Sequence, residues 1–281
     1  MTASTPILII GKNGKTGSRV NTLLKNRGLA VRAVSRASTP PFDWEDQSTW
    51  AVPLEGIQSA YVTYQPDLAV PQAEATIRDF VSLAKSKGVK HIVLLSGRGE
   101  AGAQRAENVL IDSGLTWNVV RASWFYQNFS ESFMAEGIIS GTLTLPADSI
   151  VEPFVDADDI AEVAVAALTQ PELHNRLFEV TGPKALTFAQ CVEHISTACA
   201  RPITYNYVPI EPYIAQLDKQ GIPADYQWLL RELFTEVFDG RNSHVMHGVE
   251  EALGRSPRSF ADYAEEAAKN EVWADAEHAT P

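Results

Sequence analysis

Cysteine and long apolar runs are scarce in this sequence. Its only cysteines, Cys191 and Cys199, lie eight positions apart in a helix-like stretch, where a disulfide is geometrically unfavourable, so we expect two reduced core thiols. Nowhere do about 18 uncharged apolar residues follow one another, and no basic stretch precedes the short apolar run near the N-terminus. Neither a membrane span nor an export signal is therefore predicted, and we expect a cytoplasmic protein.

Positive charge is also in short supply. The chain has 23 Lys and Arg against 35 Asp and Glu, which gives a net charge of −12. Nucleic acids and acidic membranes bind proteins mainly through basic residues that neutralise phosphate. Both are therefore unlikely partners, and we expect a small-molecule ligand and a monomer or homodimer.

The first 170 residues alternate short apolar runs with stretches of helical period, which is the pattern of βαβ units and a parallel sheet. The expected strands are 7–10, 29–35, 59–63, 91–96 and 116–121, and 177–182 adds one more. We predict an α/β fold, a Rossmann-type doubly wound parallel sheet with a small, mainly helical C-terminal substrate lobe.

The division into domains follows the change of pattern. Residues 1–183 are assigned to the Rossmann core, with a candidate hairpin at 142–154, and residues 184–281 to the helical, aromatic-rich lobe. Residues 275–281 are expected to form a frayed tail.

A glycine-rich loop follows the first strand and opens the first helix. Gly11, Gly14 and Gly17 stand in the sequence GKNGKTG, at the point where a tight turn, close backbone approach and helix N–H groups suit a pyrophosphate. The spacing is G-x-x-G-x-x-G rather than the commoner G-x-G-x-x-G, and no G-K-[ST] follows at the distance a P-loop requires. The alternative is a glycine-rich turn without a ligand.

The residues after the second strand indicate which dinucleotide binds. A site specific for NAD usually carries Asp or Glu there to accept the ribose hydroxyls. Here the strand ends in Val34-Ser35-Arg36. A guanidinium favours a 2′-phosphate, and Lys12 or Lys15 can assist by charge. We therefore expect NADPH with weaker use of NADH, the alternative being that Arg36 is a solvated surface arginine.

Several further motifs accompany the loop: FDWEDQSTW with a following LEG, KHIVLLS, E-x-x-L-x-x-SGL-x-W-x-x-x-R at 107–121, WF-x-QNF at 124–129, FVDADDIAEVA and ALGR-x-PR-x-FADYA. With them the chain resembles, over almost its whole length, the NmrA-like atypical short-chain dehydrogenase/reductases, and within them the triphenylmethane reductase, NAD(P)H azoreductase and festuclavine dehydrogenase branch. The resemblance implies a Rossmann fold and NADPH, with substrate between the sheet's carboxyl edge and the C-terminal lobe.

The resemblance also implies the contacts of the dinucleotide, all at strand carboxyl ends. It places Ser35 and Arg36 by the adenosine phosphate and Asp43-Trp44 beside the adenine. Two further loops lie along the ribose and nicotinamide, and a third lies by the nicotinamide. The expected cofactor-binding residues are Gly11, Lys12, Asn13, Gly14, Lys15, Thr16, Gly17, Ser35, Arg36, Asp43, Trp44, Thr63, Tyr64, Gln65, Ser96, Gly97, Arg98, Ser123, Trp124 and Phe125.

Ordinary short-chain dehydrogenases use a Tyr-x-x-x-Lys dyad as acid and base. Alignment of the E-x-x-L-x-x-SGL motif with related sequences puts Gly99 at the tyrosine and Ala103 at the lysine. Without that acid, which contributes roughly 10²–10⁴-fold, the expected acceptors are conjugated and electron-poor or cationic: imine or iminium, azo, triarylmethane or quinone-like compounds. The catalytic residues stay unknown. The substrate-contacting residues are expected to include Tyr126, Asn128, Tyr226 and Trp228.

Other polar clusters are assigned structural roles. Asp156, Asp158 and Asp159 precede a helix and are expected to cap it, and His91 is expected to be structural. The Cys191–His194 and His244–His247 pairs lack the further ligands that zinc needs, so no metal is expected.

Two other functions stay open at this point. One is a non-catalytic NADP(H)-binding redox sensor of NmrA type, which would also dispense with the dyad. The other is a ketone reductase that uses an unrecognised acid.

Overall fold

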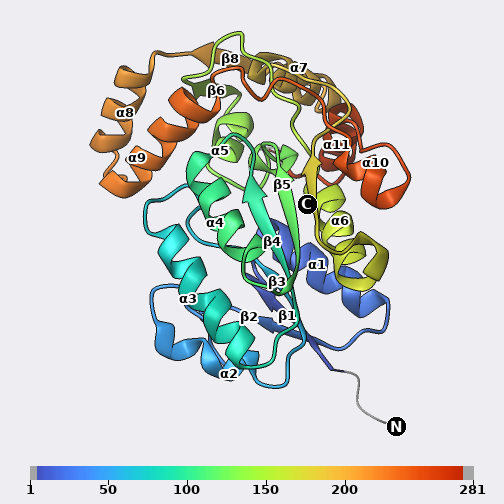
Figure 1. Ribbon diagram of the computed structural model, residues 1–281. Helices are drawn as coiled ribbons and strands as arrows, with labels where there is room; N and C mark the ends of the chain where they lie inside the picture. The colour runs from blue at the N-terminus through green and yellow to red at the C-terminus, as the bar shows by residue number, and fades with distance from the viewer. Residues whose placement is uncertain (1–4, 275–281) are drawn as a thin grey trace. The chain divides into compact units, whose positions relative to one another are not determined.

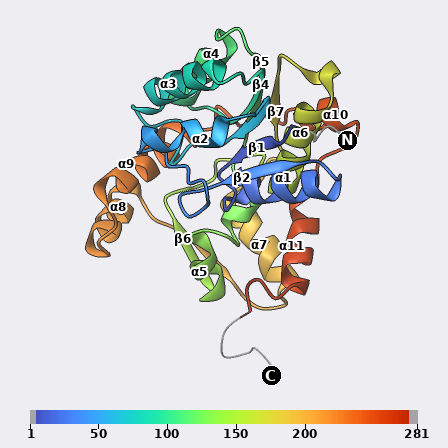
Figure 2. The ribbon, with the colours of Figure 1, turned by 90° about the horizontal axis from the view of Figure 1, so that it is seen from below.

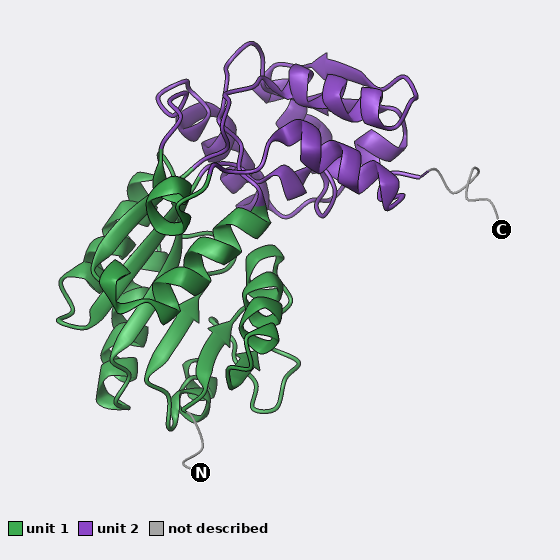
Figure 3. Ribbon diagram, turned by 90° about the vertical axis from the view of Figure 1, so that its right-hand side faces the viewer, with its two compact units in different colours: residues 1–122, 157–180, 247–255 green, residues 123–156, 181–246, 256–281 purple. Residues whose placement is uncertain are grey.

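The computed structural model describes residues 5–274. The chain divides into two compact units that interleave along the sequence (Figure 3). The first comprises the residues up to 122 together with 157–180 and 247–255, and the second comprises 123–156, 181–246 and the residues from 256 onward. The sequence-based division placed a single boundary after residue 183. The expected tail at 275–281 lies outside the described residues.

A six-stranded parallel sheet forms the centre of the first unit (Figure 1). Its strand order is β2-β1-β3-β4-β5-β7, and every neighbouring pair is parallel. The strands are β1 (Ile7–Ile10), β2 (Val31–Val34), β3 (Ser59–Val62), β4 (His91–Gly97), β5 (Thr116–Ala122) and β7 (Arg176–Val180). All six predicted strands are present, and β1, β3 and most of β4 are buried apolar runs, as expected of parallel strands covered on both faces.

Helices cover both faces of this sheet. Helices α1 (Lys15–Asn26) and α6 (Ala157–Thr169) pack together on one face, and α3 (Ala73–Ser86) and α4 (Ala101–Ile111) pack together on the other (Figure 2). The shorter elements of the unit are α2 (Ala51–Leu54), α10 (Gly248–Leu253) and 3₁₀ turns at Gln47–Thr49 and Pro171–Leu173. The fold is the predicted doubly wound, Rossmann-type α/β architecture.

The last strand explains why the units interleave. β7 hydrogen-bonds to β5 and completes the sheet, so 157–180 belong to the first unit although 123–156 do not. Helix α10 returns to the same place, since a Cβ on Gly248 would overlap the backbone of Glu179 in β7. Pattern along the chain identified β7 as a strand but carried no information about its partner.

The second unit is mainly helical. Its helices are α5 (Met134–Ile139), α7 (Phe188–Ala198), α8 (Ile210–Lys219), α9 (Ala224–Glu232) and α11 (Phe260–Lys269), with a 3₁₀ turn at Tyr126–Asn128 and a π-helical turn at Leu233–Val237. The candidate hairpin at 142–154 does not form. β6 (Thr142–Leu145) instead pairs in parallel with β8 (Thr204–Tyr207), and Leu143 and Leu145 of β6 lie in the core of this unit.

Aromatic rings fill the core of the second unit. Phe129, Phe154 and Phe188 contact one another with ring centroids 5.0–5.8 Å apart. Both cysteines are free: Cys191 is buried in this core, where burial raises the pKa of its thiol, and Cys199 caps the C-terminus of α7. The expectation of core thiols is confirmed for Cys191, whereas Cys199 is only partly buried.

The three aspartates near α6 have separate partners. Asp156 directly precedes the helix and accepts a hydrogen bond from Gln127 (2.9 Å). Asp158 and Asp159 lie in the first turn, where the helix dipole favours negative charge, and they pair with Arg19 (2.9 Å) and Arg255 (2.7 Å). These pairings support structural roles for the three carboxylates.

His91 begins β4 and is buried among polar side chains. Its Nε2 lies 2.9 Å from Oδ1 of Asn118, whose amide nitrogen donates to the carbonyls of Leu173 and Arg176. Oδ1 must therefore accept, so Nε2 of His91 carries the proton. Burial, together with the nearby charge of His174, lowers the pKa of His91 to about 4, and the imidazole is neutral at pH 7. These contacts support the structural role expected for His91.

This shift predicts a loss of stability in acid. The unfolded chain protonates His91 near pH 6.5 and the folded chain only near 4. The free energy of unfolding should therefore fall as pH drops through this window, by up to about 2 kcal/mol at pH 5. Urea unfolding at pH 7.5 and 5.0 should show that His91→Gln loses less stability than the wild type. His244→Gln at an exposed histidine is the control, and equal pH slopes for wild type and His91→Gln would contradict the assignment.

Candidate functional site

The order of the strands reverses between β1 and β3. In open α/β sheets, ligands bind beyond the carboxyl ends of the strands at such a reversal. The segment Gly11–Gly14 follows β1 here, and Thr63–Gln65 follow β3. Both segments had been assigned to a dinucleotide site, and the fold brings them to the same sheet edge.

The glycine loop is a tight turn that leads into α1. Gly11 has a φ of +84°, and the amide of Gly14 donates to the carbonyl of Gly11 (2.9 Å). Gly14 is the N-cap of α1 and provides no side-chain cap for the first-turn amides. Those amides have no intrahelical acceptor and form a binding site for an anion.

The three glycines are needed for different reasons. A Cβ on Gly11 would overlap the Oγ1 of Thr63, and one on Gly17 would overlap the backbone of Gly11, so both positions are closed by the protein itself. A Cβ on Gly14 would meet only the Gly11 carbonyl, at 3.3 Å. Gly14 is therefore the one of the three positions at which the protein itself leaves space for a side chain.

Hydrogen bonds hold the loops of β1, β2 and β3 together. Thr63 Oγ1 donates to the carbonyl of Ile10 (3.1 Å), and Asn13 Nδ2 lies 3.5 Å from Ser35 Oγ. At the helix start, Thr16 Oγ1 accepts from the buried hydroxyl of Tyr61 (2.9 Å). These bonds link the segments after β1, β2 and β3 to one another at this edge of the sheet.

Aromatic side chains pack beside the segment that follows β3. Trp44 donates its Nε1–H to the carbonyl of Thr63 (2.9 Å), and its ring lies 5.0 Å from that of Tyr64. Phe42 packs edge-on against Trp44 at 4.9 Å. The backbone of Asp43 is held by Thr49 and Trp50. A partly buried indole of this kind is suited to contact an aromatic base.

Arg36 and Lys12 supply the positive charge at this edge. Arg36 is exposed just beyond β2, and Lys12 follows Gly11. Among the described residues neither has an ion-pair partner. Ser35, which precedes Arg36, lies in a turn closed by Ser38, whose Oγ accepts from the Ser35 amide (2.8 Å). The turn presents a guanidinium that is not committed to a carboxylate.

A buried ionic network lies under the carboxyl end of β4. Ser96 Oγ donates to Glu107 Oε1 (2.5 Å), and the guanidinium of Arg121 bridges Glu107 and Glu179. Arg98 Nε lies 3.7 Å from Glu179. Pairing with the two glutamates raises the pKa of Arg121. Because the only hydroxyl proton of Ser96 is donated to Glu107, its oxygen can only accept from a ligand.

Gly99 and Ala103, the residues expected at the two positions of the short-chain dyad, have no side-chain proton donor. Gly99 lies in a turn with a φ of +80°, and Ala103 is fully buried in α4. Glu107 and Arg121 belong to the motif at 107–121, and the sequence alone indicated no role for either residue. Their ion pair could have been suspected from the sequence, because a glutamate on the apolar face of a predicted helix and an arginine in a predicted buried strand lie fourteen residues apart.

The remaining expected site residues lie in the second unit. Ser123, 2% exposed, donates to Glu152 (2.5 Å), and Trp124 packs on Phe188, Phe234 and Phe238. Phe125 forms an isolated bridge with Val155.

The expected substrate residues differ in their exposure. Tyr126 is 1% exposed and donates its hydroxyl to the carbonyl of Arg258 (3.1 Å), which assigns its side chain to the core of the unit. Asn128 is half-buried, and Tyr226 and Trp228 are about 40% exposed on α9. Of the four, Asn128, Tyr226 and Trp228 present accessible side chains.

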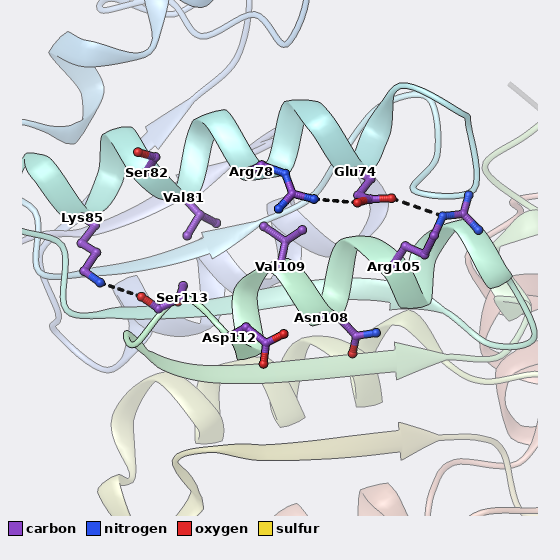
Figure 4. A pocket seen from close by; sticks show the side chains of 10 residues that line it. All are labelled: Glu74, Arg78, Val81, Ser82, Lys85, Arg105, Asn108, Val109, Asp112 and Ser113. Atoms are coloured by element: carbon purple, nitrogen blue, oxygen red, sulfur yellow. Dashed lines mark hydrogen bonds and ion pairs between the residues drawn. The ribbon is translucent and has the colours of Figure 1, made fainter.

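A hollow of about 520 Å³ between α3 and α4 contains none of the expected site residues (Figure 4). Glu74 pairs there with Arg78 (2.6 Å) and Arg105 (3.3 Å), and Lys85 donates to the carbonyl of Ser113. Glu74 and the two arginines of this hollow thus pair with one another. Within residues 5–274 no three His, Cys, Asp or Glu side chains gather as metal ligands, and no helix there is long and apolar enough to cross a membrane.

Comparison with known proteins gives the family. The NmrA-like family matches residues 104–264. Festuclavine synthase II of Penicillium roqueforti is 32% identical, over 95% of this chain and 99% of its own. Prestalk A differentiation protein A of Dictyostelium discoideum is 28% identical (94% and 93%), and the NAD(P)H azoreductase of Xenophilus azovorans is 29% identical (92% and 96%).

Solved structures agree in fold. The NADPH complex of a quinone oxidoreductase from Escherichia coli has a TM-score of 0.77 at 18% identity and covers 92% of this chain and 99% of that one. The NADP(H) complex of the Citrobacter triphenylmethane reductase has a TM-score of 0.73 at 15% identity, covering 94% and 99%. The chain belongs to the NmrA-like family of Rossmann-fold NAD(P)H-dependent oxidoreductases.

Proposed function

We propose that this protein is an NADPH-dependent reductase that transfers hydride to a conjugated, electron-poor or cationic acceptor of imine or iminium, azo, triarylmethane or quinone-like type. The observation that carries the proposal is the glycine loop at the reversal of strand order, with a space at Gly14 limited by only one carbonyl. Named relatives that act as an azoreductase and a festuclavine synthase support the acceptor class.

The chain's residues have distinct tasks toward the dinucleotide. The first-turn amides of α1 bind the pyrophosphate, Ser35 and Arg36 bind the 2′-phosphate, and Trp44 contacts the adenine. Ser96 accepts a hydrogen bond from the ribose or the carboxamide, since its own proton is committed to Glu107. Bound NADPH supplies the hydride, and the protein holds the acceptor against it; positioning alone can contribute about 7–11 kcal/mol.

The acceptor class follows from the residues at positions 99 and 103. A ketone must be polarised by a donor as hydride arrives, and Gly99 and Ala103 provide none. Iminium, triarylmethyl and azo compounds already carry positive charge or an electron-poor π bond, so they depend less on such a donor. Tyr226 and Trp228 are proposed to contact the flat acceptor. The partner is a small molecule, and the protein acts in the cytoplasm as a monomer or homodimer.

A redox sensor that binds NADP(H) without turnover is the second candidate. A differentiation protein among the relatives favours it, and it too would lack the dyad. Incubation with NADPH and a panel of cationic dyes, cyclic imines, quinones and azo dyes separates the two. The reductase proposal predicts turnover of at least one class. Tight NADP binding without turnover of any class would favour the sensor.

The exposed guanidinium at the end of β2 predicts the cofactor preference. A hydrogen bond to a charged group is worth about 1.5–3 kcal/mol, or roughly 10–150-fold, and exposure and salt favour the lower end. We expect NADPH to be preferred over NADH by about tenfold or more in kcat/KM at low salt. Arg36→Ala should remove most of this preference and leave NADH use nearly intact, with Lys12 or Lys15 retaining a remainder.

The control for this variant is Arg27→Ala, which removes an exposed guanidinium from the opposite end of α1. Its NADPH preference should match that of the wild type. Equal use of the two cofactors by the wild type, or undiminished preference in Arg36→Ala, would show that the phosphate binds elsewhere.

A further inference from the structure

A buried tyrosine lies under the first turn of α1. Tyr61 stands in β3 opposite Ile9 of β1, and it is 0% exposed. Its neighbours Ala60 and Val62 face the core shared with α3 and α4, so alternation along the strand directs Tyr61 to the other face, where α1 packs. There its hydroxyl lies 2.9 Å from Oγ1 of Thr16, the second residue of the helix. A core hydroxyl thus reaches the turn proposed to bind the pyrophosphate.

The two hydroxyl groups carry two protons but share one hydrogen bond. Thr16 is the only hydrogen-bond partner of Tyr61 within residues 5–274. A bond in the reverse direction would therefore leave the proton of Tyr61 buried without an acceptor, which is unfavourable. Burial raises the pKa of Tyr61, so its hydroxyl keeps its proton at neutral pH. Tyr61 thus donates, Thr16 accepts, and the proton of Thr16 is left for another acceptor.

That proton has no acceptor within the described part of the chain. A threonine in a helix commonly donates to the carbonyl four residues earlier, as Thr22 of the same helix does to Ser18 (3.0 Å). Thr16 lies too near the start of α1 for such a bond. It is also only 3% exposed, and buried polar groups as a rule have partners. We therefore expect a ligand group to accept the proton.

The position of Thr16 indicates that this group is the pyrophosphate. The amides of Thr16 and Gly17 also lack an acceptor among residues 5–274, and they belong to the first turn of α1. Only two carbon atoms separate the hydroxyl of Thr16 from its own amide nitrogen, so an anion bound to the amide is within reach of the hydroxyl. The turn is held closely, because a Cβ on Gly17 would overlap the backbone of Gly11.

We propose that the hydroxyl of Thr16 donates a hydrogen bond to the pyrophosphate of the bound dinucleotide, and that Tyr61 is a positioning residue that orients this hydroxyl from the core. The proton of Tyr61 occupies the side of the Thr16 oxygen that faces the sheet, so Thr16 cannot turn its own proton there. The donor is aligned before the ligand arrives and loses less freedom on binding. The proposal rests on the dinucleotide site of the proposed reductase and adds a side-chain donor to its backbone amides.

The test measures the Kd of NADPH and of NADH by fluorescence titration. Thr16→Val keeps the shape of the side chain and removes the donor, so both Kd values should rise by the same factor, about tenfold or more, since a hydrogen bond to a charged group is worth roughly 10–150-fold. Thr16→Ser keeps a hydroxyl and should stay within about twofold of the wild type. Tyr61→Phe leaves the donor unaligned and should raise both values about three- to tenfold. Thr22→Val is the matched control and should bind as the wild type does.

Stability separates this role from a purely structural one. Thr16→Val alone leaves the proton of Tyr61 buried without an acceptor and should lower the midpoint of thermal unfolding. Thr16→Val/Tyr61→Phe removes both groups and should recover most of the stability, but it should bind both dinucleotides as weakly as Thr16→Val. Recovery of affinity together with stability would mean that the pair only supports the fold, and it would overturn the proposal.

Adenosine 2′-monophosphate shows which phosphate accepts the bond. It carries the 2′-phosphate but no pyrophosphate, so its Kd, measured by competition with NADPH, should be unchanged in Thr16→Val and raised in Arg36→Ala. An equal loss for this compound, or a loss for NADPH that NADH does not share, would assign Thr16 to the 2′-phosphate and contradict the proposal. Unchanged NADPH affinity in folded Thr16→Val protein would contradict it too. A wild type that binds neither dinucleotide would instead refute the proposed function itself.

Discussion

Gly14→Val is expected to weaken NADPH binding at least about a hundredfold while the protein stays folded. The valine would occupy the space over the first-turn amides of α1, where the pyrophosphate is proposed to bind. Loss of two hydrogen bonds to a charged group costs about 3 kcal/mol or more, which corresponds to a loss of affinity of at least about a hundredfold. The protein should lose only about 1 kcal/mol of stability, because a Cβ at Gly14 meets one carbonyl at 3.3 Å.

Two variants of the same helix make this result specific. Thr22→Val places the same side chain on the exposed face of α1 and should leave NADPH affinity unchanged. Gly17→Ala should lower the midpoint of thermal unfolding, since its Cβ would overlap the Gly11 backbone. Fluorescence titration with NADPH and thermal unfolding measure the two effects. Unchanged NADPH affinity in folded Gly14→Val protein would refute the loop assignment.

Charged or strongly activated acceptors should be reduced at least about a hundredfold faster, in kcat/KM, than simple ketones. Ketone reduction needs a donor bound to the carbonyl oxygen during hydride transfer, and neither Gly99 nor Ala103 has one. Ser96 does not replace it, because its hydroxyl proton is held by Glu107, whose carboxylate pairs with Arg121. The measurement is NADPH oxidation with a cationic triarylmethane dye, a cyclic iminium salt and an unactivated cyclic ketone of similar size.

Glu107→Gln tests the part that Ser96 plays in this selectivity. Ketones are expected to react slowly because the hydroxyl proton of Ser96 is committed to the carboxylate of Glu107. If this is correct, removing the carboxylate should raise the ratio of the ketone rate to the dye rate. Robust ketone reduction by the wild type would mean that the site has an acid we have not identified. Loss of that activity in a single tyrosine variant would then name it.

The sequence was sufficient for the sheet and the glycine loop. The six strands of the sheet are short, mainly apolar runs bounded by turns, as expected of parallel strands with helices on both faces. The turn at Gly11 could be predicted because a positive φ and a close approach of the backbone both favour glycine. Both patterns involve residues that are close together in the chain, so they can be detected in a single sequence.

Long-range pairing left no such signal. β6 pairs with β8, which lies about 60 residues further along the chain. Nothing in the sequence TLTL indicates this partner, so a hairpin with a neighbouring segment was predicted instead. Tyr126 looked like a loop residue, but it anchors the core through Phe260 and Tyr263.

The most direct test of the account follows the hydrogen that NADPH transfers. Wild-type protein is incubated with NADPH that carries deuterium at the transferable C4 position and with a cationic triarylmethane dye, and the leuco product is analysed by mass spectrometry. We expect one deuterium on the central carbon of each product molecule, formed in step with oxidised cofactor, and no product from Gly14→Val protein at the same cofactor concentration. Tight cofactor binding with no labelled product from this dye or from imine, quinone and azo acceptors would contradict it.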